Sequence, residues 1–240
     1  MSVLLPLALS LLLVLLLVLG ALWRRQRRTR RAEFIQNYSF PKGLFDKLQA
    51  QRPALTLKDC QLVSLALRQF FSAYLQGGLR PVAMPSQVVD DLWHEFILHT
   101  RNYERFCQSA FGAFMHHTPA VAMGGQARSN AGLRRCWWQC CRAEHINPRQ
   151  PTRLPLLFAI DAKLHIEGGF HYVPDCGPLS RRTDGSATVV HCGGDFSNAS
   201  YDGGTDGLGD GDGSGGSASD AGSGDSGGDG GGCSGGGCSS

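Results

Sequence analysis

An uninterrupted apolar stretch at the N-terminus restricts the fold of this chain more than any other feature. Residues from Val3 to Trp23 carry no charge. A helix of about 21 residues rises about 31 Å, which matches the hydrocarbon core of a bilayer. Pro6 lies near the start, where a proline costs a helix little. Segment 1–23 is therefore expected to be a transmembrane anchor that contacts the lipid bilayer through residues 3–23.

A block of arginines directly after the apolar stretch predicts its orientation. Positive charge on the C-terminal side of a span favours a cytoplasmic location for the rest of the chain. A cleaved signal peptide is the competing interpretation, but it would carry its positive charge before a shorter apolar region. We expect a single-pass protein of the cell (inner) membrane, with its N-terminus outside and its body cytoplasmic. The basic juxtamembrane segment, 24–33, contains Arg24, Arg25, Arg27, Arg28, Arg30 and Arg31.

The C-terminal end of the chain is acidic and rich in glycine. Seven aspartates lie between Asp202 and Asp229, and no lysine or arginine follows Arg182. Such a segment buries too little apolar surface to offset its ordering entropy, so residues 193–240 are expected to form a disordered Gly/Ser/Asp-rich tail. The net charge of +3 does not show that positive charges cluster after the apolar stretch and negative charges in the tail. The remaining part of the chain is only mildly basic and has no basic stripe, so no nucleic-acid partner is expected.

Helix signals dominate between the two ends and predict a helical globular domain over 34–192. Thr56, with Asp59 three residues later, forms the N-cap pattern of a helix that Gly77-Gly78 ends. Ser86 is the expected N-cap of a helix that runs to about residue 109. Its apolar positions recur at helical spacing over a wide arc.

Further elements complete the expected architecture. One helix or a helix pair is expected over 34–51, with a break at Phe40-Pro41, and another helix over 130–144. The apolar segment 154–164 is ambiguous. Two short strands, at 170–173 and 187–191, suggest a hairpin. The expected fold class is mainly α: one N-terminal transmembrane helix, a compact helical domain with a small β-hairpin, and a disordered Gly-rich tail.

The densest cluster of polar side chains lies between Asp90 and His117. Asp90 and His94 are four residues apart, so they share one helical face, where a carboxylate can orient an imidazole toward a metal or a substrate. The adjacent His116 and His117 can close on this face. Neutral imidazoles and a carboxylate suit zinc or iron. The candidate metal ligands are Asp90, His94, His116 and His117; no catalytic residue or organic cofactor is assigned.

Structural interpretations compete with metal binding at several of these positions. His99 falls within the apolar stripe of its helix, which favours a hydrogen-bonded core residue. His116 and His117 are loop residues without a defined partner. His94-Glu95 is followed by a histidine at 99 and not at 98, so the chain lacks the H-E-x-x-H motif. The chain also lacks a G-x-S-x-G elbow, a Walker loop and a dinucleotide fingerprint, which favours a protein that is not an enzyme.

Nine cysteines are present, and a cytoplasmic body predicts that their thiols are free. Cys136, Cys140 and Cys141, with His145, form a second candidate metal cluster. Because two tryptophans lie among these thiols, we favour the interpretation that they fill space in the core. Cys233 and Cys238 in the tail lack further ligands and give only a weak metal signal.

One segment resembles a known family. The residues are Asp90-Asp91-Leu92-Trp93-His94-Glu95-Phe96-Ile97-Leu98, then Tyr103, Phe106-Cys107, Phe111-Gly112 and His116-His117-Thr118-Pro119. Over roughly 34–175 the chain is similar to glycine-rich domain-containing proteins, which include bacterial members of unassigned function and larger plant relatives. Plant members usually carry a second histidine two residues after the first, where this chain has Phe96. The resemblance supports the architecture and implies no established catalytic activity.

Two functions are consistent with these observations. The first is an interaction or scaffold module, held at the cytoplasmic membrane face, that binds a protein partner and needs no cofactor. The second is a zinc- or iron-binding domain, or a metal-dependent enzyme, that uses Asp90, His94, His116 and His117. Whether the two histidine positions converge in space separates these hypotheses, because shared tetrahedral ligation requires it.

Overall fold

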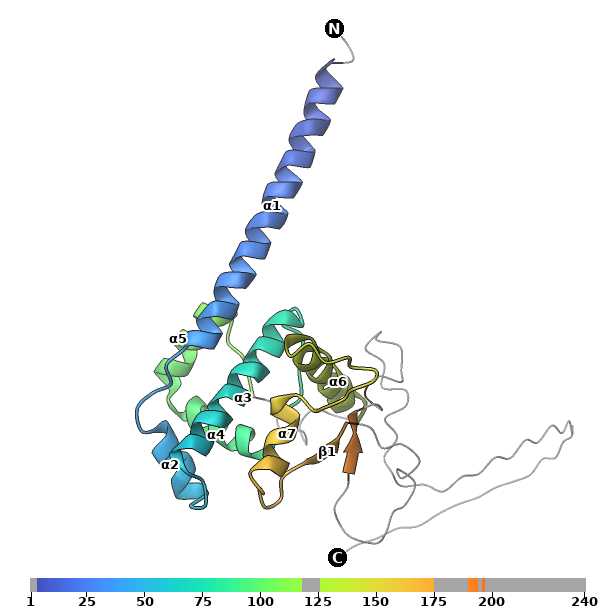
Figure 1. The fold of residues 1–240 in the computed structure, drawn as a ribbon. Coiled ribbons are helices and arrows are strands. Elements are labelled where there is room, and N and C mark those ends of the chain that lie inside the picture. The colour runs from blue at the N-terminus through green and yellow to red at the C-terminus, as the bar shows by residue number, and fades with distance from the viewer. Residues whose placement is uncertain (1–3, 118–125, 175–189, 194–195, 197–240) are drawn as a thin grey trace, which may run out of the picture. The chain divides into compact units, whose positions relative to one another are not determined.

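The structure, a computed structural model, describes residues 4–117, 126–174, 190–193 and 196. Within these ranges the chain folds into seven α-helices and two short strands, which confirms a mainly helical fold (Figure 1). Several predictions fall outside the described residues. These are the Thr118-Pro119 turn, the strand residues 187–189 and nearly all of the tail, including Cys233 and Cys238.

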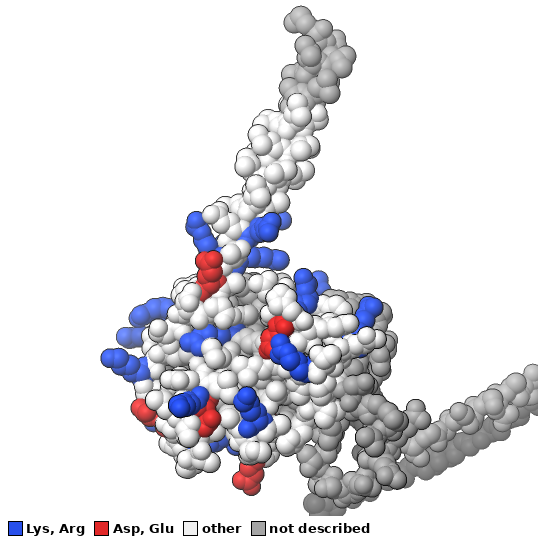
Figure 2. Space-filling model, viewed as in Figure 1, with Lys and Arg blue, Asp and Glu red and all other residues white. Residues whose placement is uncertain are grey.

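The N-terminal helix α1 (Leu4–Asn37) continues past the apolar stretch and through the arginine block. Large apolar side chains from Leu9 to Trp23 are 49–71% exposed. The helix is long and apolar enough to cross a membrane, a test of length and composition that an N-terminal signal sequence also passes. The arginines gather on α1 between its apolar part and the rest of the domain (Figure 2). The expected boundaries after residues 23 and 33 therefore lie inside one helix.

The last turns of α1 belong to the folded domain. Ile35 is completely buried, and the Gln36 side-chain amide donates a hydrogen bond to Ser72 Oγ at 3.0 Å. These residues pack α1 against α3 (Leu57–Gln76) and α5 (Thr100–Ala110). Helical backbone thus joins the exposed apolar segment directly to the core.

The central helix, α3, begins and ends as its sequence predicts. Thr56 Oγ accepts a hydrogen bond from the Asp59 N–H at 3.3 Å, and the Asp59 carboxylate accepts one from the Thr56 N–H at 2.9 Å, which completes a capping box. Gly78 ends the helix with a φ of +77°, a left-handed conformation that glycine adopts without strain. The helix contacts α2 (Leu44–Gln51), and the predicted break at Phe40-Pro41 separates α2 from α1.

The expected single helix over 86–109 is wrong, because the chain forms α4 (Gln87–Leu98) and then α5, with His99 between them. The Phe96 ring lies 5.2 Å from the Tyr103 ring and 5.4 Å from the Phe106 ring. In a straight helix, residues ten positions apart are separated by about 15 Å. The break at His99 lets α5 fold back so that these aromatic rings pack together.

Two further helices pack on α3. The predicted helix over 130–144 is confirmed as α6 (Gln126–Ala143), and the ambiguous segment 154–164 contains α7 (Leu156–Lys163). Trp137 of α6 is completely buried, and its ring lies 5.1 Å from that of Phe158 on α7. An aromatic contact therefore joins α6 to α7 within the core.

The expected β-hairpin is wrong. Strands β1 (His171–Val173) and β2 (Val190–Cys192) pair in parallel, with His171 opposite Val190. A parallel pair needs a crossover connection, so a tight hairpin turn cannot join these strands. Phe196, which the glycine-rich composition assigns to the tail, is only 4% exposed and packs on Trp137. The core therefore extends past residue 192.

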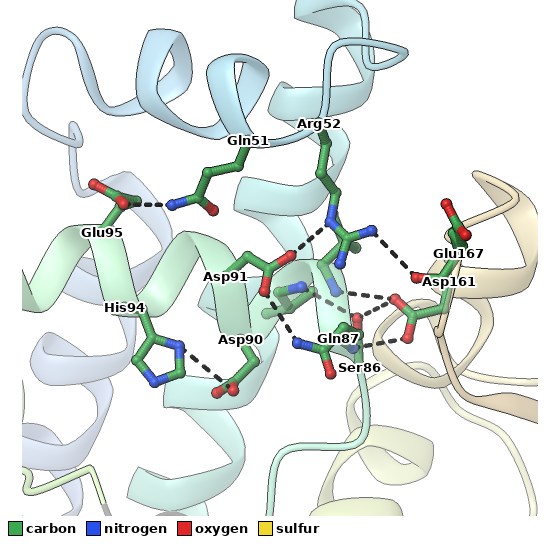
Figure 3. Close-up of polar contacts among 12 residues, drawn as sticks. Gln51, Arg52, Ser86, Gln87, Asp90, Asp91, His94, Glu95, Asp161 and Glu167 are labelled. Atoms are coloured by element: carbon green, nitrogen blue, oxygen red, sulfur yellow. Dashed lines mark hydrogen bonds and ion pairs between the residues drawn. The ribbon is translucent and has the colours of Figure 1, made fainter.

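One buried carboxylate, that of Asp161 on α7, holds three segments together. Its oxygens accept hydrogen bonds from Ser86 Oγ and the Gln87 N–H at 2.7 Å, and from the Val88 N–H at 3.3 Å (Figure 3). It also accepts from the Phe170 N–H at 2.9 Å, just before β1. Asp161 thereby accepts hydrogen bonds from N–H groups in the first turn of α4 that have no partner within the helix. Its negative charge also interacts favourably with the partial positive charge at the N-terminus of α4.

The Asp161→Asn substitution is expected to destabilise the domain. An amide cannot accept four hydrogen bonds, and its own N–H₂ would face donors, so the loss should be about 2–3 kcal/mol. For a domain of this size, that corresponds to a fall in Tm of about 5–10 °C, measured by circular dichroism on full-length protein in detergent. The exposed Asp46→Asn is the matched control and should shift Tm by less than about 2 °C. Equal shifts for the two variants would contradict this role.

Candidate metal centre

Asp90 and His94 project from the first turns of α4, which the Ser86 N-cap and Asp161 hold in place. Ser86 Oγ accepts from the Val89 N–H at 3.3 Å, so the helix starts where its sequence predicts. His94 Nδ1 lies 3.5 Å from an Asp90 carboxylate oxygen, as the spacing of four residues requires (Figure 3). The sequence therefore predicts this pair correctly.

Other carboxylates of α4 have structural partners on a different side of the helix. Asp91 accepts from Arg52 Nε at 2.6 Å, and Glu95 accepts from the Gln51 side-chain amide at 2.6 Å, so both join α4 to the end of α2. Figure 3 shows these contacts turned away from Asp90 and His94. Among these three carboxylates, Asp90 is the one that contacts imidazoles.

A buried chain of hydrogen bonds fixes the segment after α5. Trp93 Nε1 on α4 donates to Tyr103 OH at 3.2 Å, and Tyr103 OH donates to the Met115 carbonyl oxygen at 2.6 Å. Burial raises the pKa of Tyr103 far above its usual range, so the hydroxyl stays protonated and able to donate. This chain holds the residues just before His117 against α4.

His117 completes a group of three side chains. Its Nε2 lies 3.1 Å from the second carboxylate oxygen of Asp90. Its ring centroid is 4.3 Å from that of His94 and 4.6 Å from that of Trp93. Asp90 thus stands between two imidazoles and offers one oxygen to each.

The three side chains have the spacing that one metal ion needs. One ligand atom from each of Asp90, His94 and His117 lies within 4.8 Å of the others. Bonds of about 2.0–2.1 Å in a tetrahedral site separate ligand atoms by about 3.3 Å, which small rotamer changes would reach here. The side chains of Asp90, His94 and His117 are 23%, 51% and 16% exposed, so an ion could enter from solvent.

The other histidines predicted near this cluster lie elsewhere. His116 is exposed and its ring lies 4.9 Å from that of Phe114, so it does not join the group that the structure forms. His99 lies at the break between α4 and α5, half-buried, where its backbone carbonyl accepts from the Tyr103 N–H at 2.9 Å. Of the four candidate ligands, three converge and His116 does not.

The cysteine cluster of α6 is packed in the core. Cys136, Cys140 and Cys141 are completely buried and free, and the Sγ atoms of Cys136 and Cys140 are 4.0 Å apart. Burial raises the pKa of Cys141 to about 12, which disfavours the thiolate that binds metals. His145 is exposed beyond the end of the helix. The interpretation that these thiols fill space agrees with this environment.

Two residues that shape the site have roles that spacing did not reveal. Tyr103 lies on another arc of the expected long helix, and only the break at His99 makes its hydroxyl an anchor for the His117 segment. Its buried polar tip is still a usable signal, because a buried tyrosine hydroxyl normally requires a partner. Asp161 likewise stands out as an acidic residue within the apolar run 154–164.

Tyr103→Phe is expected to loosen the His117 segment. The substitution leaves the indole N–H of Trp93 and the Met115 carbonyl without their partner, at a cost of about 1–3 kcal/mol. Amide hydrogen exchange of residues 113–117 should become faster, with a lower Tm for the full chain. Tyr74→Phe is the matched control, because the Tyr74 ring packs on Phe111. Unchanged exchange in Tyr103→Phe would show that the hydroxyl does not hold the segment.

Comparison with known proteins places the chain in a family but assigns no activity. The family model described as UCP032817-like matches residues 30–196. Neither a curated protein nor a solved structure matches the chain. The matched residues run from the last turns of α1 to the buried Phe196, and therefore include the metal-ligand candidates and the core. Since the match covers well over half of its length, the chain belongs to the UCP032817-like family.

Proposed function

We propose that this chain is a single-pass membrane-anchored protein whose helical domain binds one divalent transition-metal ion through Asp90, His94 and His117. The observation that supports the proposal is the convergence of the three ligand atoms within 4.8 Å. Two of the residues come from one face of α4, and the third comes from a segment held by Tyr103. Residues far apart in sequence thus meet through the fold itself.

The donor set favours zinc or iron. Two neutral imidazoles and one carboxylate are common ligands of both ions, whereas calcium and magnesium prefer oxygen alone. Three protein ligands leave at least one coordination position open to water or a substrate. A bound ion would activate that water or polarise a carbonyl group, so the chemistry open to the site is metal-assisted hydrolysis or oxidation.

The interaction-module hypothesis has less support from the described surface. Outside α1, the exposed large apolar residues in the described part of the chain are Leu57, Leu65, Leu98, Phe114 and Phe170. Single exposed apolar residues are normal on soluble surfaces and do not identify a protein partner. The metal-binding function is therefore the one that the geometry supports best, and a protein partner is a secondary proposal.

Metal binding can be tested on the full-length, tag-free protein in detergent. Elemental analysis after exposure to Zn²⁺ and desalting should give about one ion per chain. His94→Ala, His117→Ala and Asp90→Asn should each weaken Zn²⁺ binding at least about 100-fold in competition with a chromogenic chelator. His116→Ala and His99→Ala are the matched controls and should bind as the unmodified protein does. Stoichiometry below about 0.2, or equal losses in His116→Ala and His94→Ala, would refute the site.

We also propose that α1 spans the membrane with the domain on the cytoplasmic side, on the basis of the six arginines after the apolar stretch. In a bacterial host, a phosphatase that folds only in the periplasm should stay inactive when fused after residue 240. Changing the six arginines to glutamine should raise its activity severalfold, and changing them to lysine should not. Phosphatase activity in the unmodified fusion, or a mature N-terminus near residue 24, would contradict this topology.

A further inference from the structure

A pocket beside α3 has no part in the metal centre. It has a volume of about 320 Å³ and lies where the segment after α1 and the start of α2 face α3. This volume is at the lower end of the range for small-molecule sites. Four of its lining residues are apolar and three are polar: Phe40, Pro41, Phe45, Leu65, Gln61, Ser64 and Arg68.

Arg68 supplies the only positive charge among the lining residues. Its guanidinium lies 5.0 Å from the centre of the Phe40 ring, and two N–H groups donate to Ser64 Oγ at 3.1 Å and to the Tyr38 carbonyl at 2.9 Å. These contacts fix the orientation of the charged group at the pocket wall. Burial lowers the pKa of Arg68, although the group remains protonated at physiological pH.

This charge has no acidic partner in the part of the chain that the structure describes. Arg52 and Arg153 each pair with a carboxylate there, whereas Arg68 contacts a hydroxyl and a carbonyl. Its buried Nε has no hydrogen-bond partner among these described residues. A partly buried cation without a counter-charge is unfavourable, so an anion at this wall would stabilise the pocket.

We propose that this pocket binds a small organic carboxylate with an apolar body, such as an aryl- or alkyl-carboxylate. The single guanidinium of Arg68 can pair with one carboxylate. An apolar ligand body can pack on the rings of Phe40 and Phe45 and on Leu65. A nucleotide or sugar phosphate fits less well, because the lining offers one cation and few further donors. The proposal is independent of metal binding, since the two sites share no residue.

The probe for this site is 4-(4-fluorophenyl)butanoate, with its neutral amide as the matched ligand. Fluorine NMR is recorded on the full-length protein in phosphatidylcholine nanodiscs, with empty nanodiscs to subtract partitioning. For about thirteen non-hydrogen atoms at about 0.3–0.4 kcal/mol each, the expected Kd is about 0.1–1 mM. The amide should bind at least about tenfold more weakly, because it cannot pair with Arg68.

Two variants test the roles of charge and shape. Arg68→Gln should weaken carboxylate binding at least about tenfold. Leu65→Glu should have the same effect, because it places a negative charge that repels the ligand carboxylate at the half-exposed rim of the pocket, without disturbing the core. Arg80→Gln, an exposed arginine outside the pocket, should bind as the unmodified chain does. Asp90→Asn should leave carboxylate binding unchanged and so separates this site from the metal centre.

Several outcomes would overturn the proposal. The first is that no binding is seen at a probe concentration of about 10 times the expected Kd. The second is equal affinity for the amide and the carboxylate, and the third is an unchanged affinity for the carboxylate in both Arg68→Gln and Leu65→Glu. Near-UV circular dichroism shows whether Arg68→Gln keeps the native fold. If it does not, Leu65→Glu decides the result alone. Stronger displacement of the probe by an acidic peptide than by other carboxylates would assign the pocket to a protein partner and count against a small ligand.

Discussion

The buried carboxylate of Asp161 is the interaction on which the arrangement of the domain depends. It joins α7 to the first turn of α4 and to the segment that leads into β1. The first turn of a helix has free N–H groups and a partial positive charge, so a carboxylate placed there is both hydrogen-bonded and electrostatically favoured. Because Asp90 lies only one turn later, the same contact that closes the core also sets the position of the metal-ligand face.

Local sequence signals predicted the parts of the fold that local chemistry decides. The capping box of Thr56 and Asp59 and the Ser86 N-cap act within four residues, so their helices begin where the pattern indicates. The break at His99 depends on packing of Phe96 against α5. The parallel sheet forms between β1 and β2, which are distant from each other in the sequence. Periodicity within one segment carries no information on such long-range contacts.

In the candidate site, too, local spacing was predictable from the sequence and long-range contacts were not. The helical spacing of Asp90 and His94 predicted their shared face, because both residues lie on one element. The sequence could not choose between His116 and His117, which are adjacent in a loop. The choice is made by Tyr103, which fixes the Met115 carbonyl and leaves the His117 ring beside Asp90, while the His116 ring lies on Phe114. The partners of that tyrosine hydroxyl, Trp93 and the Met115 carbonyl, were not predictable while α4 and α5 were treated as one helix.

The continuity of α1 determines how movement would pass between lipid and domain. Fourteen residues of helix, about 21 Å long, lead from Arg24 to Asn37, and Ile35 near their end is completely buried in the core. A continuous helix of this kind is a rigid connection and not a flexible linker. For a chain anchored as proposed, bilayer thickness sets the tilt of the apolar segment, and the domain must follow that tilt. The angle at which the metal-ligand face meets the water layer would then report the thickness of the surrounding membrane.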